Sequence, residues 1–393
     1  MQAFQNVLLY EDPPSRSRKF LPLTYTRSVA ELRTGAFTAI ERIQAIFREA
    51  RLYLHCAPEL KSVVAARYGL PVNEVPSGGT LLINAREALA FNPNNHWHVY
   101  EEIPSEIAGR FVTGAAIDPP EAVREDAPQS LWDVIHANAA ALTLDAELWP
   151  MVNRSVEHPS FENCAIVKPE NLLIHPTARI DAGIVLDCSE GEIIIEEGAH
   201  IMPHATIIGP AFIGKNSVVK IGAKIYEGTT IGPVSKVGGE IENSIIQGYS
   251  NKQHDGYLGH SFLGEWVNLG AGTNTSDLKN DYSPVRVTIE GEEFETGKLF
   301  VGLMMGDHSK SAIGTQFNTG TAVGVSCNVF CPGFPPKWVP SFSWCGPNGI
   351  VSYKFEKAIA VANAVESRRG ISLTPEEEAL LHRLFERSVS VPV

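Results

Sequence analysis

The 393-residue chain lacks the features that define several common protein classes. It has six cysteines, too few for a disulfide scaffold, and no paired CxxC spacing of a zinc site, so we interpret them as small buried thiols. No apolar run approaches the roughly 18 to 20 residues of a membrane span. The segment Met1–Tyr10 has no basic region followed by an apolar one, as a signal peptide would. We therefore expect a reduced, cytoplasmic protein with no metal site and no membrane contact.

Positive charge is also scarce. The chain has 32 lysines and arginines against 45 aspartates and glutamates, a net charge of −13. A nucleic-acid backbone binds clustered Lys and Arg and repels an acidic surface, which argues against a general nucleic-acid partner. Hydrophobic residues make up 44% of the chain, enough to fill the cores of two or three domains.

What the sequence does contain is a six-residue repeat. Stepping by six reaches eight consecutive β-branched aliphatic residues, namely Ile195, Ile201, Ile207, Ile213, Val219, Ile225, Ile231 and Val237. This period is typical of a parallel β-helix, in which short strands form the faces of a prism and one aliphatic residue per face points inward. We expect the coil to run from about Leu172 to Pro332, with Tyr257, Leu263 and Leu269 continuing the ladder after a slip near Gly238.

One stretch inside the coil does not follow the period. Val285, Val287 and Ile289 alternate with polar residues, and Gly291 follows them. This pattern predicts a hairpin extruded from the prism. Loops of this kind usually line the binding face of a solenoid.

The chain divides into three expected parts, residues 1–155, 156–345 and 346–393. The first mixes short apolar strands with helical patterns and is expected to be an α/β domain. The second holds the repeat. The third should form C-terminal helices, because Thr374-Pro375-Glu376-Glu377 is a helix-capping sequence. In the first part we expect strands at Val7–Tyr10, Leu52–His55, Thr80–Ile83 and Trp97–Tyr100, and a helix from Ser130 to Trp149.

Polar residues that interrupt the aliphatic ladder indicate a candidate site. The densest polar cluster is Tyr249–Tyr257, and Val267–Thr273 follows near one coil turn later. With about 18 residues per turn, His254 and Gly272 should stack on adjacent coils. An imidazole accepts protons near neutral pH, and small residues allow a ligand to approach the backbone. The alternative is a corner histidine that only hydrogen-bonds its neighbours.

The same region resembles a known enzyme family. Asn243–Ile246, His254–Ser261 and Gly264–Thr273 match the motifs NSII, H-x-x-Y-[LV]-G-[DH]-S and G-x-x-V-N-x-G-A-G-T. These are typical of the acetyltransferase half of the bifunctional N-acetylglucosamine-1-phosphate uridylyltransferase/glucosamine-1-phosphate N-acetyltransferase family. The similarity covers residues 174–332. It implies a left-handed parallel β-helix of hexapeptide repeats, a homotrimer and acetyl-CoA as the acyl donor.

The resemblance also implies roles for single residues. His254 matches the general base, Tyr257 a sugar-phosphate contact and Asn268 a contact to the substrate amine. Glu240 matches a glutamate near the amino sugar. Ala271 matches the backbone that faces the acyl-CoA, and with Gly272 it offers amides to the thioester oxygen.

Two positions depart from the family pattern. Glu242 stands where the family has a lysine for the sugar phosphate, and Asp277-Leu278 replaces an Asn-Tyr pair. An acid in place of a phosphate-binding lysine reverses the local charge. The acceptor therefore stays open between a sugar phosphate and a nucleotide sugar.

The front part is similar to sugar-phosphate nucleotidyltransferases, but reduced. Phe20–Arg27 resembles their R-L-x-P-L-T-x-x-[RK] stretch. Their glycine-rich phosphate loop is replaced by Tyr10–Arg18, which has no glycine and two prolines that lack N–H donors. Asn84-Ala85 stands where the family holds magnesium, so Mg²⁺ is expected only if this domain is active. As candidates for contacting nucleotide phosphates we name Arg16, Arg18, Lys19 and Arg27, with a solvated loop as the alternative.

The sequence therefore favours one function and keeps others open. The favoured function is acyl transfer, most simply of acetyl from CoA, to an amine of a sugar phosphate or nucleotide sugar. The alternatives are sugar-1-phosphate nucleotidyl transfer, alone or as a second activity, and a non-catalytic sugar-nucleotide-binding protein.

Overall fold

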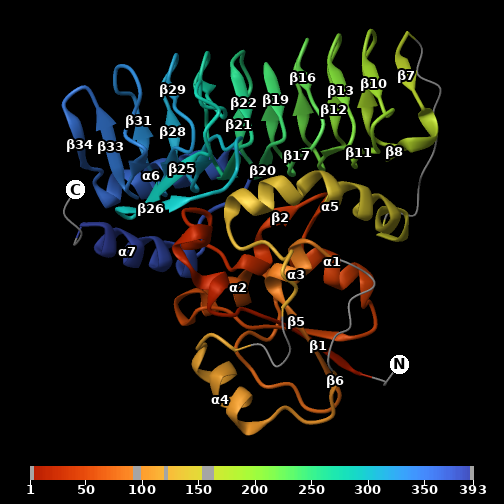
Figure 1. Ribbon diagram of the computed structural model, residues 1–393, viewed down its shortest axis with the longest axis vertical. Helices are drawn as coiled ribbons and strands as arrows, with labels where there is room; N and C mark the ends of the chain where they lie inside the picture. Colours follow the sequence, from red (N-terminus) through yellow and green to blue (C-terminus); the bar gives the residue numbers. More distant parts are fainter. Residues whose placement is uncertain (1–3, 92–98, 119–122, 153–162, 390–393) are drawn as a thin grey trace.

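The computed structural model describes residues 4–91, 99–118, 123–152 and 163–389. An α/β domain, a long parallel β-helix and a helical tail follow one another along the chain, which is the expected fold class (Figure 1). Trp97 of the expected fourth strand and the expected boundary at residues 155–156 lie outside the described residues.

The front domain is built on a four-stranded sheet in the order β4-β1-β5-β6. Strands β4 (Arg51–Leu54), β1 (Asn6–Tyr10) and β5 (Thr80–Asn84) are parallel, and β6 (Val99–Tyr100) is antiparallel to β5. All five residues of β1 are buried, which explains its continuous apolar run. The domain also contains β2 (Arg33–Thr34), β3 (Phe37–Thr38), α1 (Ala39–Ile46), α2 (Lys61–Tyr68), α3 (Ala85–Leu89) and α4 (Ser105–Thr113).

Helix α5 (Leu131–Val152) joins the front domain to the coil. It begins where expected, because the Ser130 hydroxyl accepts a hydrogen bond from the backbone N–H of Asp133 at 3.2 Å. Its Asn138 amide donates to the carbonyl of Gly228 in the coil at 2.8 Å. Its Asp145 carboxylate forms a buried ion pair with Arg42 of α1 at 2.7 Å. The helix therefore fixes the front domain against the coil.

Three parallel sheets form the faces of the coil. The first sheet contains β7 (Ala165–Val167), β10 (Val185–Asp187), β13 (Thr206–Ile208), β16 (Lys224–Ile225), β19 (Glu240–Glu242) and β22 (Tyr257–Gly259), and the pair β24 (Asn274–Thr275) and β29 (Gln316–Phe317) follows on that face. The second contains β8 (Leu172–Ile174), β11 (Ile193–Ile195), β14 (Ala211–Ile213), β17 (Thr229–Ile231), β20 (Ile245–Gly248), β23 (Phe262–Glu265), β27 (Met304–Met305), β30 (Ala322–Val323) and β32 (Trp338–Val339). The third contains β9 (Arg179–Ile180), β12 (His200–Ile201), β15 (Val218–Val219), β18 (Lys236–Val237) and β21 (Asn251–Lys252), and later coils add β28 (Lys310–Ser311), β31 (Asn328–Val329), β33 (Ser343–Gly346) and the antiparallel β34 (Gly349–Ser352).

The aliphatic ladder forms the core of the coil. All eight residues from Ile195 to Val237 are at most 1% exposed, as the period predicts. The prediction for Tyr257 is wrong, because Leu258 points inward instead and is fully buried. The inward residues Leu258 and Leu263 are five residues apart, whereas Ile207 and Ile213 keep the six-residue step. This shorter step moves the inward position on the first sheet one residue later than the period predicts.

The second sheet faces the front domain. The Gln247 side chain of β20 donates to the carbonyl of Glu31 at 2.8 Å and accepts from the backbone N–H of Arg33 at 3.0 Å. The extruded hairpin, β25 (Arg286–Ile289) and β26 (Glu292–Glu295), forms as expected. Val287 and Ile289 of this hairpin are fully buried in one core with the front domain. The hairpin therefore packs toward the front domain.

The tail consists of α6 (Phe355–Ser367) and α7 (Pro375–Val389). The capping sequence forms as predicted, since Glu377 N–H donates to the Thr374 hydroxyl at 3.2 Å and Thr374 N–H to the Glu377 carboxylate at 3.0 Å. Helix α7 lies beside α2 of the front domain, below the last coils (Figure 1).

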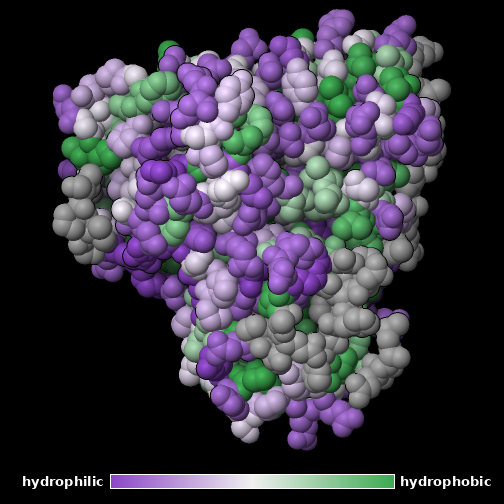
Figure 2. All heavy atoms as spheres, viewed as in Figure 1, coloured by the Kyte–Doolittle hydropathy of each residue, from purple (hydrophilic) through white to green (hydrophobic). Residues whose placement is uncertain are grey.

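The surface is mostly hydrophilic on the face shown in Figure 2, with small scattered apolar patches. No helix in the described ranges has the length and apolar composition needed to cross a membrane. Four of the six cysteines are buried, while Cys164 and Cys331 are half-buried.

Candidate active site

His254 lies on the prism edge between the third and first sheets, after β21 and before β22. Its side chain is exposed and makes no hydrogen bond to another described residue, unlike the corner histidine of the alternative interpretation. Its backbone is fixed by the neighbouring Lys252, whose ammonium donates to the carbonyls of Gly238 at 2.8 Å and His254 at 3.0 Å. Burial lowers the pKa of Lys252 to about 8. Lys252 thus holds the corner while the His254 imidazole faces solvent.

The next coil brings the expected partners beside His254. Asn268 pairs with Asn251 on one side and Lys310 on the other. Gly272 N–H donates to the carbonyl of Asp255, the residue after His254, at 3.0 Å. The Val267–Thr273 segment therefore stacks on the His254 coil, as the spacing predicts.

The two amides named from sequence differ in availability. The N–H of Gly272 is engaged by Asp255, so its expected role as a donor to a thioester oxygen does not fit this geometry. The N–H of Ala271 has no backbone partner within the described ranges, while its carbonyl accepts from Gly314 at 2.7 Å. Ala271 is therefore the amide of the pair that remains available to a ligand.

Glu240 lies on the preceding coil, directly opposite Tyr257 in the first sheet. Its carboxylate is 3.7 Å from the ammonium of Lys224, and both side chains are exposed. The structure thus brings His254, Tyr257, Asn268 and Glu240 together on three successive coils around one edge.

Tyr257 connects this edge to a second polar cluster on the first sheet. Its hydroxyl lies 2.9 Å from the carboxylate of Glu242 and 3.0 Å from that of Asp277. Burial, with the nearby charge of Asp277 and Glu242, raises the pKa of the Tyr257 phenol. Two carboxylates around one phenol make this end of the face acidic, in contrast to the phosphate contact that the resemblance implies for Tyr257.

Two histidines extend the acidic cluster and were not assigned a role from the sequence. His260 Nδ1 is 2.8 Å from the Asp277 carboxylate, and its ring stacks on Phe300 at 4.9 Å. His136, from α5, lies 5.5 Å from the His260 ring and 2.9 Å from the carbonyl of Phe300. His260 occupies the [DH] position of the motif and could have been singled out. His136 could not, because only the packing of α5 brings it there.

The loop after β1 is filled by its own carboxylates. Glu11 accepts hydrogen bonds from the Val29 backbone N–H at 2.9 Å and from Arg16 at 3.0 Å. Asp12 accepts from the Ser15 N–H at 3.0 Å and forms a buried ion pair with Arg86. Both carboxylates of this loop are therefore paired within the protein, and the Ser15 amide is not available to a nucleotide phosphate.

Asn84 does not form part of a magnesium site. Its side-chain oxygen accepts from the Arg86 N–H at 2.9 Å and caps α3, and the nearby Asp12 is neutralised by Arg86. The residues at this position therefore do not fit Mg²⁺, which prefers several free oxygen ligands. More generally, the described ranges hold no group of three or more His, Cys, Asp or Glu side chains arranged for a metal ion.

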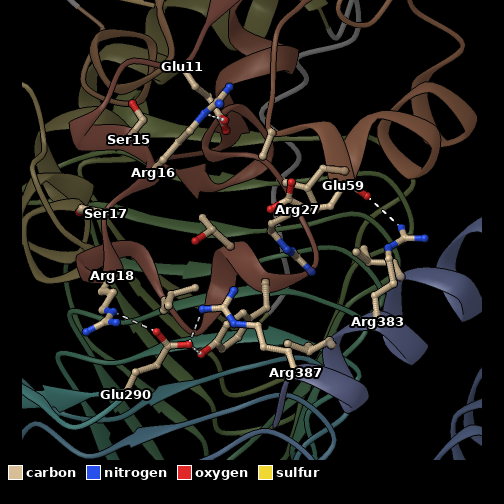
Figure 3. A pocket seen from close by; sticks show the side chains of 17 residues that line it. Glu11, Ser15, Arg16, Ser17, Arg18, Arg27, Glu59, Glu290, Arg383 and Arg387 are labelled. Carbon is tan, nitrogen blue, oxygen red and sulfur yellow. Dashed lines mark hydrogen bonds and ion pairs between the residues drawn. The ribbon is translucent and has the colours of Figure 1, made fainter. Parts of the chain in front are cut away.

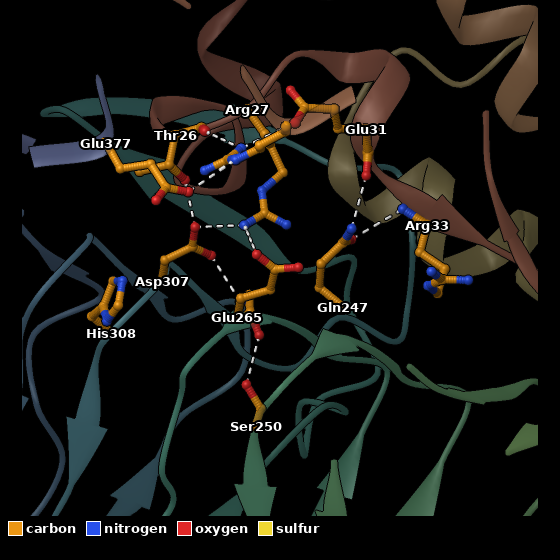
Figure 4. Close-up of polar contacts among 12 residues, drawn as sticks. Thr26, Arg27, Glu31, Arg33, Gln247, Ser250, Glu265, Asp307, His308 and Glu377 are labelled. Carbon is orange, nitrogen blue, oxygen red and sulfur yellow. Dashed lines mark hydrogen bonds and ion pairs between the residues drawn. The ribbon is translucent and has the colours of Figure 1, made fainter. Parts of the chain in front are cut away.

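The four cations named for phosphate binding do not share one environment. Arg27 is 2% exposed and pairs with Asp307 at 2.5 Å and Glu265 at 3.3 Å, so it joins the front domain to the coil (Figure 4). A cavity of about 480 Å³ lies beside the loop after β1. Lys19 does not line this cavity, and its ammonium lies 5.8 Å from the centre of the Phe294 ring of the hairpin. Arg16, Arg18 and Arg27 line that cavity. Three of the four therefore line one cavity, although Arg27 is already engaged there by two carboxylates.

The fold and the edge around His254 together define a class, a nucleotidyltransferase-like α/β domain followed by a hexapeptide-repeat β-helix. Residues 7–105 match a family described as sugar nucleotidyl transferase. The chain is 34% identical over 190 residues to the bifunctional protein GlmU of Methanococcus aeolicus, covering 48% of this chain and 41% of that protein. It is 32% identical over 147 residues to a bifunctional sugar-1-phosphate nucleotidylyltransferase/acetyltransferase of Sulfurisphaera tokodaii, covering 36% of each. The motif resemblance is thereby confirmed, although the chain matches less than half the length of these relatives.

The solved structures that align with this chain have low overall similarity to it. UDP-N-acetylglucosamine acyltransferase of Francisella novicida aligns with a TM-score of 0.32 and 14% identity, over 59% of this chain and 90% of that one. GDP-perosamine N-acetyl transferase of Caulobacter crescentus aligns with a TM-score of 0.15 and 12% identity, over 90% of this chain and 98% of that one.

Proposed function

We propose that this protein transfers an acyl group, most simply acetyl, from CoA to an amine of a sugar phosphate or nucleotide sugar. The observation that carries the proposal is the exposed His254 imidazole beside Asn268 and Ala271 on adjacent coils. These residues lie within the motifs shared with the acetyltransferase half of the resembling family. The bifunctional relatives support the same reaction class.

In the proposed reaction, the acceptor amine attacks the thioester carbonyl while His254 removes a proton from its nitrogen. A C–N bond forms, the C–S bond breaks, and CoA leaves as a thiol that takes up the proton. Asn268 orients the amine. The free N–H of Ala271 stabilises the thioester oxygen as it gains negative charge.

The acidic cluster limits how the acceptor can bind. Glu242 and Asp277 around the Tyr257 hydroxyl repel a phosphate and favour sugar hydroxyls, which donate hydrogen bonds to carboxylates. We therefore propose that the acceptor presents hydroxyls to this end of the first sheet and keeps its phosphates elsewhere.

Titration calorimetry with acetyl-CoA separates this proposal from a non-catalytic sugar-nucleotide sensor. An acyltransferase should bind the donor saturably, and a His254→Ala variant should bind it with similar affinity, because His254 acts on the acceptor. A non-catalytic sensor should not bind acetyl-CoA. Absence of acetyl-CoA binding, with a sugar nucleotide bound, would remove the proposal.

A second candidate is sugar-1-phosphate nucleotidyl transfer by the front domain, which the match over residues 7–105 favours. The carboxylate-filled loop after β1 and the cap formed by Asn84 oppose it. We expect no magnesium-dependent pyrophosphate release from a panel of nucleoside triphosphates with sugar 1-phosphates. Turnover with any pair would instead make the protein bifunctional.

A further inference from the structure

A two-chambered cleft lies between the front domain, the extruded hairpin and α7. Its chambers have volumes of about 480 and 550 Å³, within the usual range for small-molecule sites. Five residues line both chambers, namely Arg18, Tyr25, Glu290, Leu384 and Arg387. The chambers therefore adjoin, and they lie apart from the prism edge that carries His254.

The first chamber is cationic although the chain has a net charge of −13. Five arginines line it against three glutamates, namely Arg16, Arg18, Arg27, Arg383 and Arg387 against Glu11, Glu59 and Glu290 (Figure 3). Arg27 is paired with Asp307 and Glu265 outside the chamber, so the other four arginines supply its positive charge. Arg383 and Arg387 come from α7, so the tail supplies part of this charge. Guanidinium groups bind phosphate with paired hydrogen bonds, which makes an anion the fitting ligand.

A carboxylate of the chain itself occupies the anion position between the chambers. Glu290 pairs with Arg18 at 3.0 Å and with Arg387 at 2.7 Å, and it accepts a hydrogen bond from the Tyr25 hydroxyl at 2.7 Å. Figure 3 shows Arg18 and Arg387 converging on Glu290 from opposite sides. Arg18 also reaches the exposed Glu292 at 3.0 Å.

The backbone at Glu290 adds an independent indication. Glu290 and Gly291 form the two-residue turn between β25 and β26, with φ values of +49° and +78°. Asn, Asp or Gly normally occupies the first of these positions, because a longer side chain is disfavoured at positive φ. Retaining a glutamate in this strained conformation places a carboxylate between two arginines.

The second chamber has a different character. Trp338 and Pro340 from the end of the coil line it, together with Leu384 of α7. The half-buried indole of Trp338 offers a flat surface for an aromatic ring.

We propose that this cleft binds a nucleoside diphosphate or a ligand containing one, with its phosphates displacing Glu290 from Arg18 and Arg387 and its base against Trp338. Glu290 acts as an internal counter-ion that neutralises the arginines when the cleft is empty. The site is independent of the proposed acyl transfer at His254, so either proposal can fail without the other.

The test is titration calorimetry of the full chain with UDP, ADP and inorganic pyrophosphate as probes. Wild type should bind at least one nucleotide saturably. Glu290→Gln should bind it about tenfold more tightly, because two arginines lose their counter-ion. Arg387→Gln should bind it at least tenfold more weakly, and Trp338→Ala should weaken nucleotide binding while leaving pyrophosphate binding unchanged.

Arg368→Gln is the matched control, since Arg368 is exposed on the tail and lines neither chamber. If Arg387→Gln disturbs α7, as its melting temperature would reveal, Arg18→Gln removes the other cation of the pair. The proposal is overturned if neither wild type nor Glu290→Gln binds any probe saturably. An unchanged nucleotide affinity in Glu290→Gln would also overturn it.

Discussion

Glu366 of α6 is a buried acid in an acidic environment. It is 3% exposed, lies 3.7 Å from His308 and faces Glu377, Glu265 and Asp307, with Arg67 as the opposing charge. Burial and the neighbouring carboxylates raise its pKa to about 7 from an ordinary value of 4.5. In the folded protein Glu366 therefore holds its proton across a range in which the unfolded chain releases it.

A raised acid pKa makes folding less favourable as pH increases. The contribution of the protonated Glu366 to folding stability is fully present below about pH 4.5 and is lost as pH rises through about 7. Glu366→Gln stays neutral, so it should gain stability relative to wild type between pH 5 and 7.5, on the order of 1 kcal/mol. Urea unfolding at several pH values measures this difference. Glu356→Gln, at an exposed position of α6, is the control and should show no such trend.

At the residue scale, the sequence predicts contacts that follow from the repeat. His254 and Asn268 lie on adjacent coils because the period fixes which residues stack. The engagement of the Gly272 N–H by Asp255 could not be predicted, because it depends on how one shortened turn closes. The approach of His136 to His260 depends on packing between distant segments.

Among the elements, the aliphatic ladder is the main support of the coil. Ile207 is fully buried on the inner side of β13, whereas Ile221 is 63% exposed on the edge after β15. Ile207→Ala should lower the free energy of unfolding by about 2 to 5 kcal/mol through lost burial and a cavity. Ile221→Ala, the same chemical change, should stay within about 0.5 kcal/mol of wild type. Equal losses in chemical denaturation would contradict the assignment of the inner face.

Sequence periodicity predicts some of the elements and not others. The strands of the coil, the hairpin and the capped helix α7 follow from local patterns. The inward position at Leu258 does not follow from them, because the step from Leu258 to Leu263 is one residue shorter than the six-residue period. The side to which the hairpin turns also does not, because Val287 and Ile289 alternate in the same way whichever domain they pack against.

For the whole molecule, we expect a homotrimer. Ile221 and Ile313 are 63% and 79% exposed on the same prism edge as His254, and a neighbouring copy would remove this apolar surface from water. Light scattering at micromolar concentration should give the mass of three 42.8-kDa chains, about 128 kDa. A monomeric mass would rule out a site shared between subunits.

The most direct measurement of the central claim is the rate of acyl transfer from acetyl-CoA by a His254→Ala variant, with an amino-sugar phosphate or a nucleotide-linked amino sugar as acceptor. Loss of a general base should lower this rate by about 10²- to 10⁴-fold. The melting temperature should change little, because the His254 side chain is exposed and makes no hydrogen bond to another described residue. His204→Asn, an exposed histidine further along the same edge, is the control and should keep the wild-type rate. A wild-type rate in His254→Ala would contradict the account.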